Sequence, residues 1–130
     1  MRRAIIYLTE LDWEQLNKEK KKDLICWCKA QGMQMVGVVS EESASYALTT
    51  HSKRIIYNMV KLFKSDMLVI YSARELGRDE KEICENLCDF MAMDLQVVSL
   101  RNDLPENPIY RGLQIAKKDT HCKITLMDWE

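Results

Sequence analysis

Proline and glycine are scarce in this chain, with two prolines and four glycines among 130 residues. The sequence also has no low-complexity stretch and no internal repeat, so we expect most of it to be ordered. An excess of positive charge is missing as well, because 19 basic residues face 20 acidic ones and the formal net charge is −1. Without a global positive field, nucleic acid could be held only by a local patch.

Long apolar runs and paired cysteines are absent too. No run approaches the roughly 20 residues that cross a bilayer, so we expect no membrane partner. No signal peptide is recognisable, and the five cysteines are odd in number. This usage indicates a soluble, cytoplasmic protein whose cysteines are small buried side chains rather than a disulfide framework.

Cofactor and metal signatures are also lacking. Cys84 and Cys88 share a helical face and a metal site there is conceivable, but structural zinc usually takes paired cysteines or histidines on tight turns. Nor is there a glycine-rich phosphate loop. We therefore expect no cofactor and no metal.

What is present is a regular alternation of apolar segments and amphipathic ones. Four segments have the composition of buried strands, and a fifth is a candidate: Ala4–Thr9, Met35–Val39, Asp66–Tyr71, Leu95–Leu100 and Cys122–Leu126. Helical patterns lie between them: Asp12–Ala30, His51–Lys64, Ile83–Met91 and a short one over Ile109–Ala116. The order predicts one α/β domain over residues 1–130, with three layers and a mostly parallel four- to five-stranded sheet of flavodoxin-like topology. No room remains for a separate DNA-binding domain.

In such a sheet, ligands bind beyond the carboxyl ends of the strands. Four segments should meet at that edge: Thr9–Leu11, Ser40–Thr50, Ser72–Asp79 and Arg101–Asn107. The second of them is long for a loop in a compact α/β domain and is a candidate site wall.

The segment from Asp66 to Asp79 reads DMLVIYSARELGRD. It resembles the catalytic domain of resolvase/invertase-type serine recombinases, in which a strand that begins with Asp leads to a Leu-Gly-Arg segment and then a helix. The resemblance continues to Leu100 and extends weakly back to Tyr7. It implies a resolvase-like fold and a link to DNA recombination or a mobile element.

The resemblance also implies where the chemistry would lie. Active members use a serine nucleophile four residues after the tyrosine, with an arginine between them, to attack a DNA phosphate. Here those positions hold Leu11 and Thr9. Leucine cannot attack phosphorus, and the Thr9 hydroxyl has no evident activating base nearby.

The arginines of the family are only partly kept. Of the pair in the Leu-Gly-Arg segment, Arg78 remains, but the first arginine is replaced by Glu75, whose charge would repel a phosphate. Arg74 lies next to it, and Lys53 or Arg54 could replace the arginine expected near the start of the second helix, with a shift in register. These four cations are the candidate phosphate-binding residues.

Other features of this region admit structural explanations. Arg78 could instead be satisfied by Asp79 or Glu82, and Gly77 is predicted to be a turn glycine with positive φ. The long helix of the family is not recognisable beyond Asn107, and its C-terminal helix-turn-helix is absent. The lysine-rich run from Lys18 to Lys22 is predicted to be a solvated helix face, with a patch for nucleic acid or a partner as the alternative.

Three hypotheses follow from these observations. The leading one is a resolvase-like domain without recombinase catalysis, with a degenerate site at Tyr7, Thr9, Leu11 and Glu75, that binds or assembles with DNA, a second copy or a partner recombinase. The second is an atypical site-specific recombinase fragment that needs a partner to supply the missing arginines. The third is a generic flavodoxin-like regulatory domain, although no aspartate of the phosphoreceiver kind ends the third strand.

Overall fold

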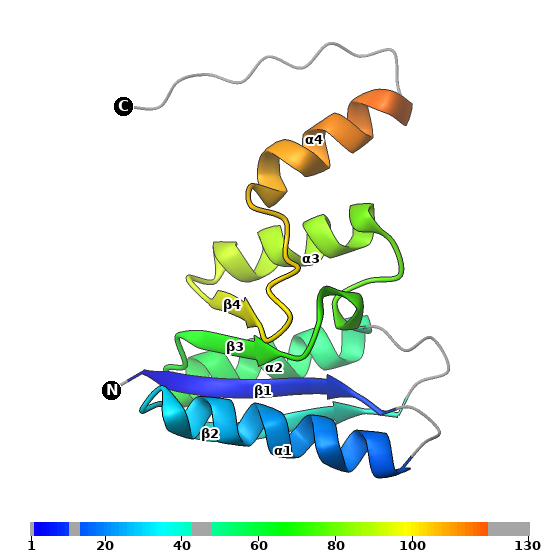
Figure 1. Cartoon of the computed structure of the whole chain (residues 1–130). Coiled ribbons are helices and arrows are strands. Elements are labelled where there is room, and N and C mark those ends of the chain that lie inside the picture. The colour runs from blue at the N-terminus through cyan, green and yellow to red at the C-terminus, as the bar shows by residue number, and fades with distance from the viewer. Residues whose placement is uncertain (1, 11–13, 43–47, 120–130) are drawn as a thin grey trace.

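The computed structural model describes residues 2–10, 14–42 and 48–119. Strands and helices alternate along these residues, and a short 3-10 turn, η1, follows the third strand (Figure 1). In chain order the elements are β1 (Arg3–Thr9), α1 (Glu14–Ala30), β2 (Gln34–Glu41), α2 (Thr50–Phe63), β3 (Met67–Ile70), η1 (Ala73–Glu75), α3 (Glu80–Ala92), β4 (Gln96–Ser99) and α4 (Pro108–Asp119). The predicted alternation is confirmed. The candidate strand Cys122–Leu126 lies outside the described residues.

The strands of the described chain form one parallel sheet in the order β2-β1-β3-β4. Ala4 of β1 pairs with Met35 on one side and with Met67 on the other, and Met67 pairs in turn with Gln96. The chain therefore starts in the interior of the sheet, moves outward to β2 and returns past β1. The order therefore reverses between β1 and β3, and in open α/β sheets ligands bind outside the carboxyl ends of the strands at such a point.

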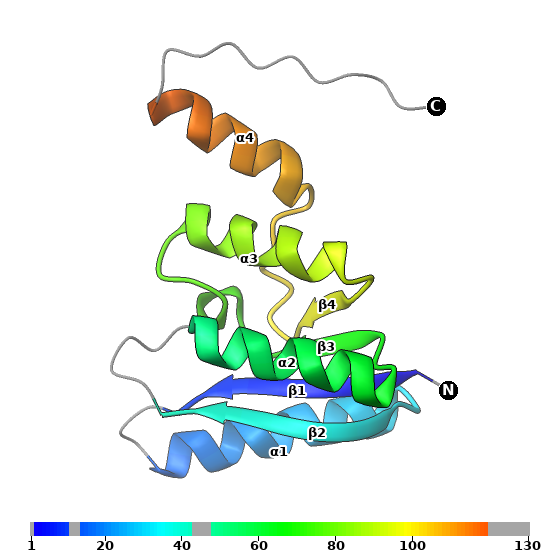
Figure 2. The same cartoon turned by 180° about the vertical axis from the view of Figure 1, so that it is seen from behind.

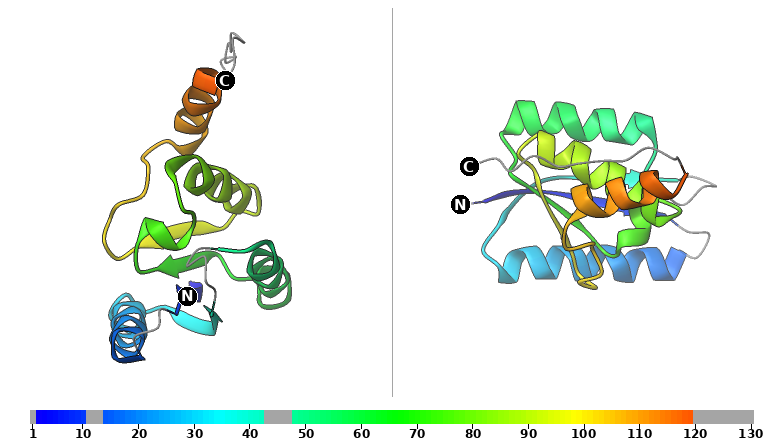
Figure 3. Two further views of the ribbon diagram at one scale, coloured as in Figure 1. Left: turned by 90° about the vertical axis from the view of Figure 1, so that its right-hand side faces the viewer. Right: turned by 90° about the horizontal axis from the view of Figure 1, so that it is seen from above.

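The two faces of the sheet carry separate cores. The ribbon shows helices on both faces of the sheet (Figures 2 and 3). Side chains alternate along β1, so that Ile5 and Tyr7 face α2 and α3 while Ile6 and Leu8 face α1. All four of these side chains are fully or almost fully buried. The three-layer α/β architecture predicted from the sequence is confirmed.

Local sequence signals set the ends of the helices. Gly32 follows α1 with a φ of 70°, a conformation that favours glycine, and so ends the helix. Thr49 caps α2 by accepting a hydrogen bond from Ser52 N, and Asp79 caps α3 by accepting one from Glu82 N. Asp12, the first residue of the helical pattern predicted over Asp12–Ala30, lies outside the described residues.

Gly77 has a different purpose from the one predicted. Its φ is not positive, so the prediction of a left-handed turn glycine is wrong. Instead the first turn of α3 packs directly on it, because a β-carbon at Gly77 would lie 2.7 Å from Ile83 N and 2.9 Å from the carbonyl carbon of Glu82. Gly77 is required because a backbone approaches its Cα closely.

The last helix, α4, stands apart from the sheet and packs on α3 (Figures 1 and 3). Gly112 of α4 faces buried Cys84 of α3, and Ile109 and Tyr110 at its beginning are about half exposed. The short helix predicted over Ile109–Ala116 is therefore confirmed. No helix within the described residues is long and apolar enough to cross a membrane.

Candidate functional site

The carboxyl edge of the sheet brings together segments that are far apart in the sequence, as predicted. Thr9 N at the end of β1 donates to Glu75 Oε1 over 3.2 Å, and Leu48 N donates to the Glu75 backbone carbonyl over 2.9 Å. Ala73 N donates to Asp103 Oδ1 over 2.9 Å. The chain after β1, the chain before α2, η1 and the chain after β4 thus meet at one place.

Glu75 is the centre of this site. The residue is only 3% exposed, and its carboxylate accepts four hydrogen bonds. Oε2 accepts from Tyr71 N at 2.8 Å and from Ser72 N at 3.4 Å, while Oε1 accepts from Thr9 N and from Lys20 Nζ. The carboxylate therefore joins the ends of β1 and β3, and its charge is satisfied inside the protein rather than offered to a ligand.

Lys20 of α1 supplies the counter-charge. Its Nζ lies 2.7 Å from Glu75 Oε1 and 3.3 Å from the Thr9 carbonyl, and it lies over the Tyr71 ring at 5.5 Å from the centroid. The prediction that the whole run from Lys18 to Lys22 is solvated is wrong at this residue, which is buried. The sequence held a signal for it, because Lys20 lies four residues before buried Leu24 on the apolar face of the helix.

A second carboxylate, which is only partly buried, lies at the end of β2. Glu41 accepts hydrogen bonds from Tyr7 Oη at 2.8 Å, from Thr49 N at 3.2 Å and from the Thr49 hydroxyl. Burial by itself would raise the pKa of Glu41, but the hydrogen bonds from Thr49, Tyr7 and Ser52 outweigh it and lower that pKa below its ordinary value. Burial, followed by this bond to Glu41, raises the pKa of Tyr7. Tyr7 thus remains a neutral donor that holds β1 to the start of α2.

The remaining positions of the predicted site offer no accessible nucleophile among the described residues. Thr9 is 2% exposed, and its backbone is occupied by the Glu75 and Lys20 contacts. Leu11 lies outside the described residues. Thr9 is thus built into the edge of the sheet.

The candidate phosphate-binding cations are not all alike. Arg74 and Arg54 are exposed, and the side chain of Arg78 is 70% exposed with its Nε 3.9 Å from Glu82 Oε2. Lys53 is occupied by an ion pair across the helix layer, with its Nζ 2.7 Å from Asp89 Oδ2 of α3. Arg74 and Arg78 follow the carboxyl end of β3, on either side of Glu75 in the chain, and both are exposed.

Metal ligands do not converge within the described part of the chain, where no three histidine, cysteine or acidic side chains are grouped to hold an ion. Cys28 and Cys84 are buried, as predicted, whereas Cys26 is exposed and so departs from that prediction. Burial raises the pKa of the Cys84 and Cys88 thiols, which disfavours the thiolate that a metal needs.

A parallel sheet in the order β2-β1-β3-β4, with hydrogen-bonded polar groups where that order reverses, defines a doubly wound α/β domain. The family model described as "Resolvase, N terminal domain" matches residues 11–117, which is most of the sequence. The chain belongs to this family and is a resolvase-like serine recombinase domain. No curated protein matches the sequence with significant similarity.

Solved structures agree with this fold. The N-terminal catalytic domain of TP901-1 integrase superposes with a TM-score of 0.70 at 15% identity, covering 91% of this chain and 95% of that one. A resolvase family site-specific recombinase from Streptococcus pneumoniae gives a TM-score of 0.71 at 9% identity, with coverages of 92% and 88%. The C-terminal catalytic domain of ISC1926 TnpA, an IS607-like serine recombinase, gives 0.62 at 20% identity, with coverages of 90% and 77%. The family assignment replaces the hypothesis of a generic flavodoxin-like regulatory domain.

Proposed function

We propose that this domain keeps the resolvase fold without its DNA-cleaving chemistry and serves as a binding and assembly module in DNA recombination. One observation carries the proposal: the buried Glu75 carboxylate, paired with Lys20, stands at the edge where phosphate chemistry needs positive charge. The carboxylate accepts hydrogen bonds from the ends of both β1 and β3. A phosphate could take its place only if those hydrogen bonds broke and the end of the sheet opened.

The requirements of phosphoryl transfer support the same conclusion. A serine recombinase needs a hydroxyl that can reach phosphorus and cations that stabilise the charge that develops there. Leu11 has no nucleophilic atom, and the Thr9 hydroxyl belongs to a buried residue. Loss of a covalent nucleophile is expected to reduce the rate by several orders of magnitude.

Assembly is supported by the apolar surface that the domain exposes. Ile109 and Tyr110 of α4 are 50% and 51% exposed, and Leu62 of α2 is 76% exposed. Contiguous exposed apolar surface often marks contacts with other proteins, and Ile109 and Tyr110 are adjacent at the start of α4. We propose a second copy or a partner recombinase as the protein partner and DNA as the shared target. The free thiols of the described cysteines suit the reducing cytoplasm.

The experiment is a cleavage assay on supercoiled plasmid, followed by denaturing gels that detect protein attached covalently to DNA. We expect no nicked or linear product and no covalent adduct. Cleavage that the Thr9→Ala variant abolishes would support the alternative of an atypical recombinase fragment. Cleavage of the plasmid by the wild-type protein would contradict the proposal. A reaction without the protein serves as the control and should leave the plasmid supercoiled.

Assembly is tested separately by measuring the mass of the protein in solution with and without duplex DNA. We expect a dimer, or a complex with DNA whose mass exceeds that of one protein chain plus one duplex. A species that stays monomeric under both conditions would contradict the assembly part of the proposal, unless an added partner recombinase raises its mass.

A further inference from the structure

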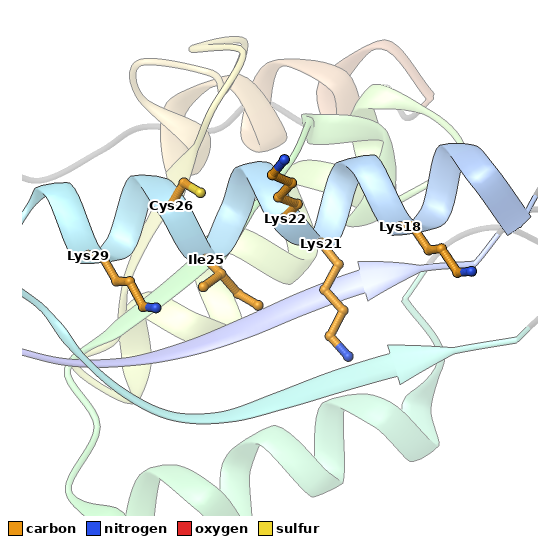
Figure 4. Close-up of a pocket in the computed structure, with 6 residues that line it drawn as sticks. All are labelled: Lys18, Lys21, Lys22, Ile25, Cys26 and Lys29. Carbon is orange, nitrogen blue, oxygen red and sulfur yellow. The ribbon is translucent and has the colours of Figure 1, made fainter.

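The outward face of α1 carries a row of lysines that the site at the sheet edge does not use. Lys18, Lys21, Lys22 and Lys29, here called the α1 lysine stripe, are all exposed. Together with Ile25 and Cys26 they line a shallow, open hollow along the helix (Figure 4). Positions 18, 22, 25 and 29 recur at spacings of three and four residues, so they share one face of the helix.

This stripe has one sign of charge although the whole chain is almost neutral. The acidic residues of the same region, Glu19 and Asp23, lie four residues apart on a neighbouring face of the helix. Leu24 and Cys28 lie on the face that is buried against the sheet. Glu19 is three residues before Lys22 and so borders the stripe, but between positions 18 and 29 four exposed lysines outnumber two exposed acidic residues and leave this surface net positive.

We propose that the α1 lysine stripe binds the phosphate backbone of duplex DNA. From Lys18 to Lys29 the stripe is about 17 Å long at a rise of about 1.5 Å per residue. Duplex DNA carries a charge about every 1.7 Å of its axis, so a straight row of exposed ammonium groups of this length meets several phosphates at once. Ammonium groups contact phosphates without reading bases, so the binding is largely independent of sequence.

Two other anionic partners fit the stripe less well. A helix that lies in a membrane surface inserts an apolar face, but the apolar face of α1 is already packed on the sheet. Single-stranded nucleic acid is usually held by aromatic side chains that stack on bases, and the stripe contains none. The rigid, regularly charged backbone of a duplex is the better match.

The stripe is also distinct from the degenerate site. α1 runs antiparallel to β1, so the stripe starts near the carboxyl edge of the sheet and leads away from it (Figure 1). Arg74 and Arg78 stay at that edge. The choice of DNA as the partner rests on the proposed function, whereas the position of the contact rests on the stripe itself.

The test measures the fluorescence anisotropy of a labelled duplex about 30 base pairs long, titrated with protein between about 50 and 200 mM salt. The variant carries Lys21→Gln, Lys22→Gln and Lys29→Gln, and Lys18 is unchanged because it makes another contact within the fold. The matched control carries Lys61→Gln, Lys64→Gln and Lys81→Gln. All three lysines are exposed: Lys61 lies in α2, Lys64 is the residue that follows α2, and Lys81 lies in α3. Both triple variants have the same net charge.

We expect the stripe variant to lose about tenfold or more in affinity at low salt and the control to lose much less. The slope of log affinity against log salt should become shallower by about 2.7, which corresponds to about 0.9 for each phosphate contact removed. Circular dichroism on both variants checks that the fold is retained. Equal losses in the two triple variants would overturn the stripe as the binding surface.

Two further arms separate this inference from the proposed function. If Arg74→Gln with Arg78→Gln abolishes binding and the stripe variant binds as the wild type does, the stripe is overturned while a DNA-binding module remains. If the wild type binds anionic lipid vesicles through the stripe but not duplex DNA, the inference is again overturned. Plasmid cleavage by the wild type would refute the proposed function and leave the stripe intact.

Discussion

Lys20 Nζ lies 2.7 Å from Glu75 Oε1, and this buried ion pair joins the middle of α1 to the turn that follows β3. The two residues are 55 positions apart in the sequence. Glu75 also accepts hydrogen bonds from the backbone N–H groups of Thr9 and Tyr71. One carboxylate therefore connects a helix to the ends of two neighbouring strands. Glu75, which occupies a position where the family resemblance implies an arginine, thus has a structural role at this edge.

The ion pair predicts a large and coupled effect on stability. Glu75→Gln should lower the free energy of unfolding by about 3 kcal/mol, because it leaves the Lys20 charge buried without a partner. Adding Lys20→Met should recover part of that loss. Urea unfolding of the wild type, both single variants and the double variant gives the coupling energy directly. Losses that simply add would contradict a coupled pair.

Glu75→Arg would restore the arginine that the family resemblance implies at this position. We expect it to destabilise the protein more than Glu75→Gln does, because it places a second cation beside Lys20 and removes the acceptor for the β1 and β3 amides. Lys20→Ala in the same chain should relieve part of the repulsion. Urea unfolding measures both effects, and a Glu75→Arg variant as stable as the wild type would show that the edge tolerates the family's arginine.

Two glycines predict different costs for the same substitution. Gly77→Ala should cost about 2 kcal/mol or more, since the new β-carbon would overlap the backbone of α3 at Ile83 N. Gly32→Ala should cost only about 1 kcal/mol, because its positive φ is strained for alanine but nothing lies within 4 Å of the new β-carbon. Thermal or urea unfolding of the two variants compares them. A larger loss at Gly32 would contradict the close approach at Gly77.

Glu41 predicts a dependence of stability on pH. Its pKa is lowered in the folded protein from an ordinary value of 4.5, so its contribution is present above about pH 4.5 and is lost as pH falls through the lower folded value. We therefore expect Glu41→Gln to be less stable than the wild type near neutral pH and the difference to shrink below about pH 4.5. Urea midpoints measured across this range test it.

Tyr7→Phe provides the control for that measurement. It removes one of the hydrogen bonds that lower the pKa of Glu41, so acid destabilisation should begin at a higher pH than in the wild type. The loss near neutral pH should be about 1 kcal/mol, typical of a single hydrogen bond. If the difference between Glu41→Gln and the wild type stayed constant from neutral to acid pH, the Tyr7–Glu41–Thr49 contacts would not depend on the charge of Glu41.

Much of the candidate site could be foreseen from the sequence. The segments after β1 and β3, the chain before α2 and the chain after β4 were expected to meet, and hydrogen bonds such as Leu48 N to the Glu75 carbonyl join them. The carboxyl ends of parallel strands must lie at one edge, so topology alone places these segments together. What the sequence did not reveal was how the charges there are paired.

The sequence by itself determined the layers of this protein, because the alternation of buried strands and amphipathic helices is written in local periodicities of two and 3.6 residues. It also shows a leucine at position 11 and a glutamate at position 75, where the family resemblance implies a serine and an arginine. Only the tertiary structure decided that Glu75 is held by Lys20 and that Gly77 serves close packing rather than a left-handed turn. Both outcomes depend on contacts between residues that are far apart in the sequence or on the exact path of the backbone. Local sequence patterns do not predict such contacts.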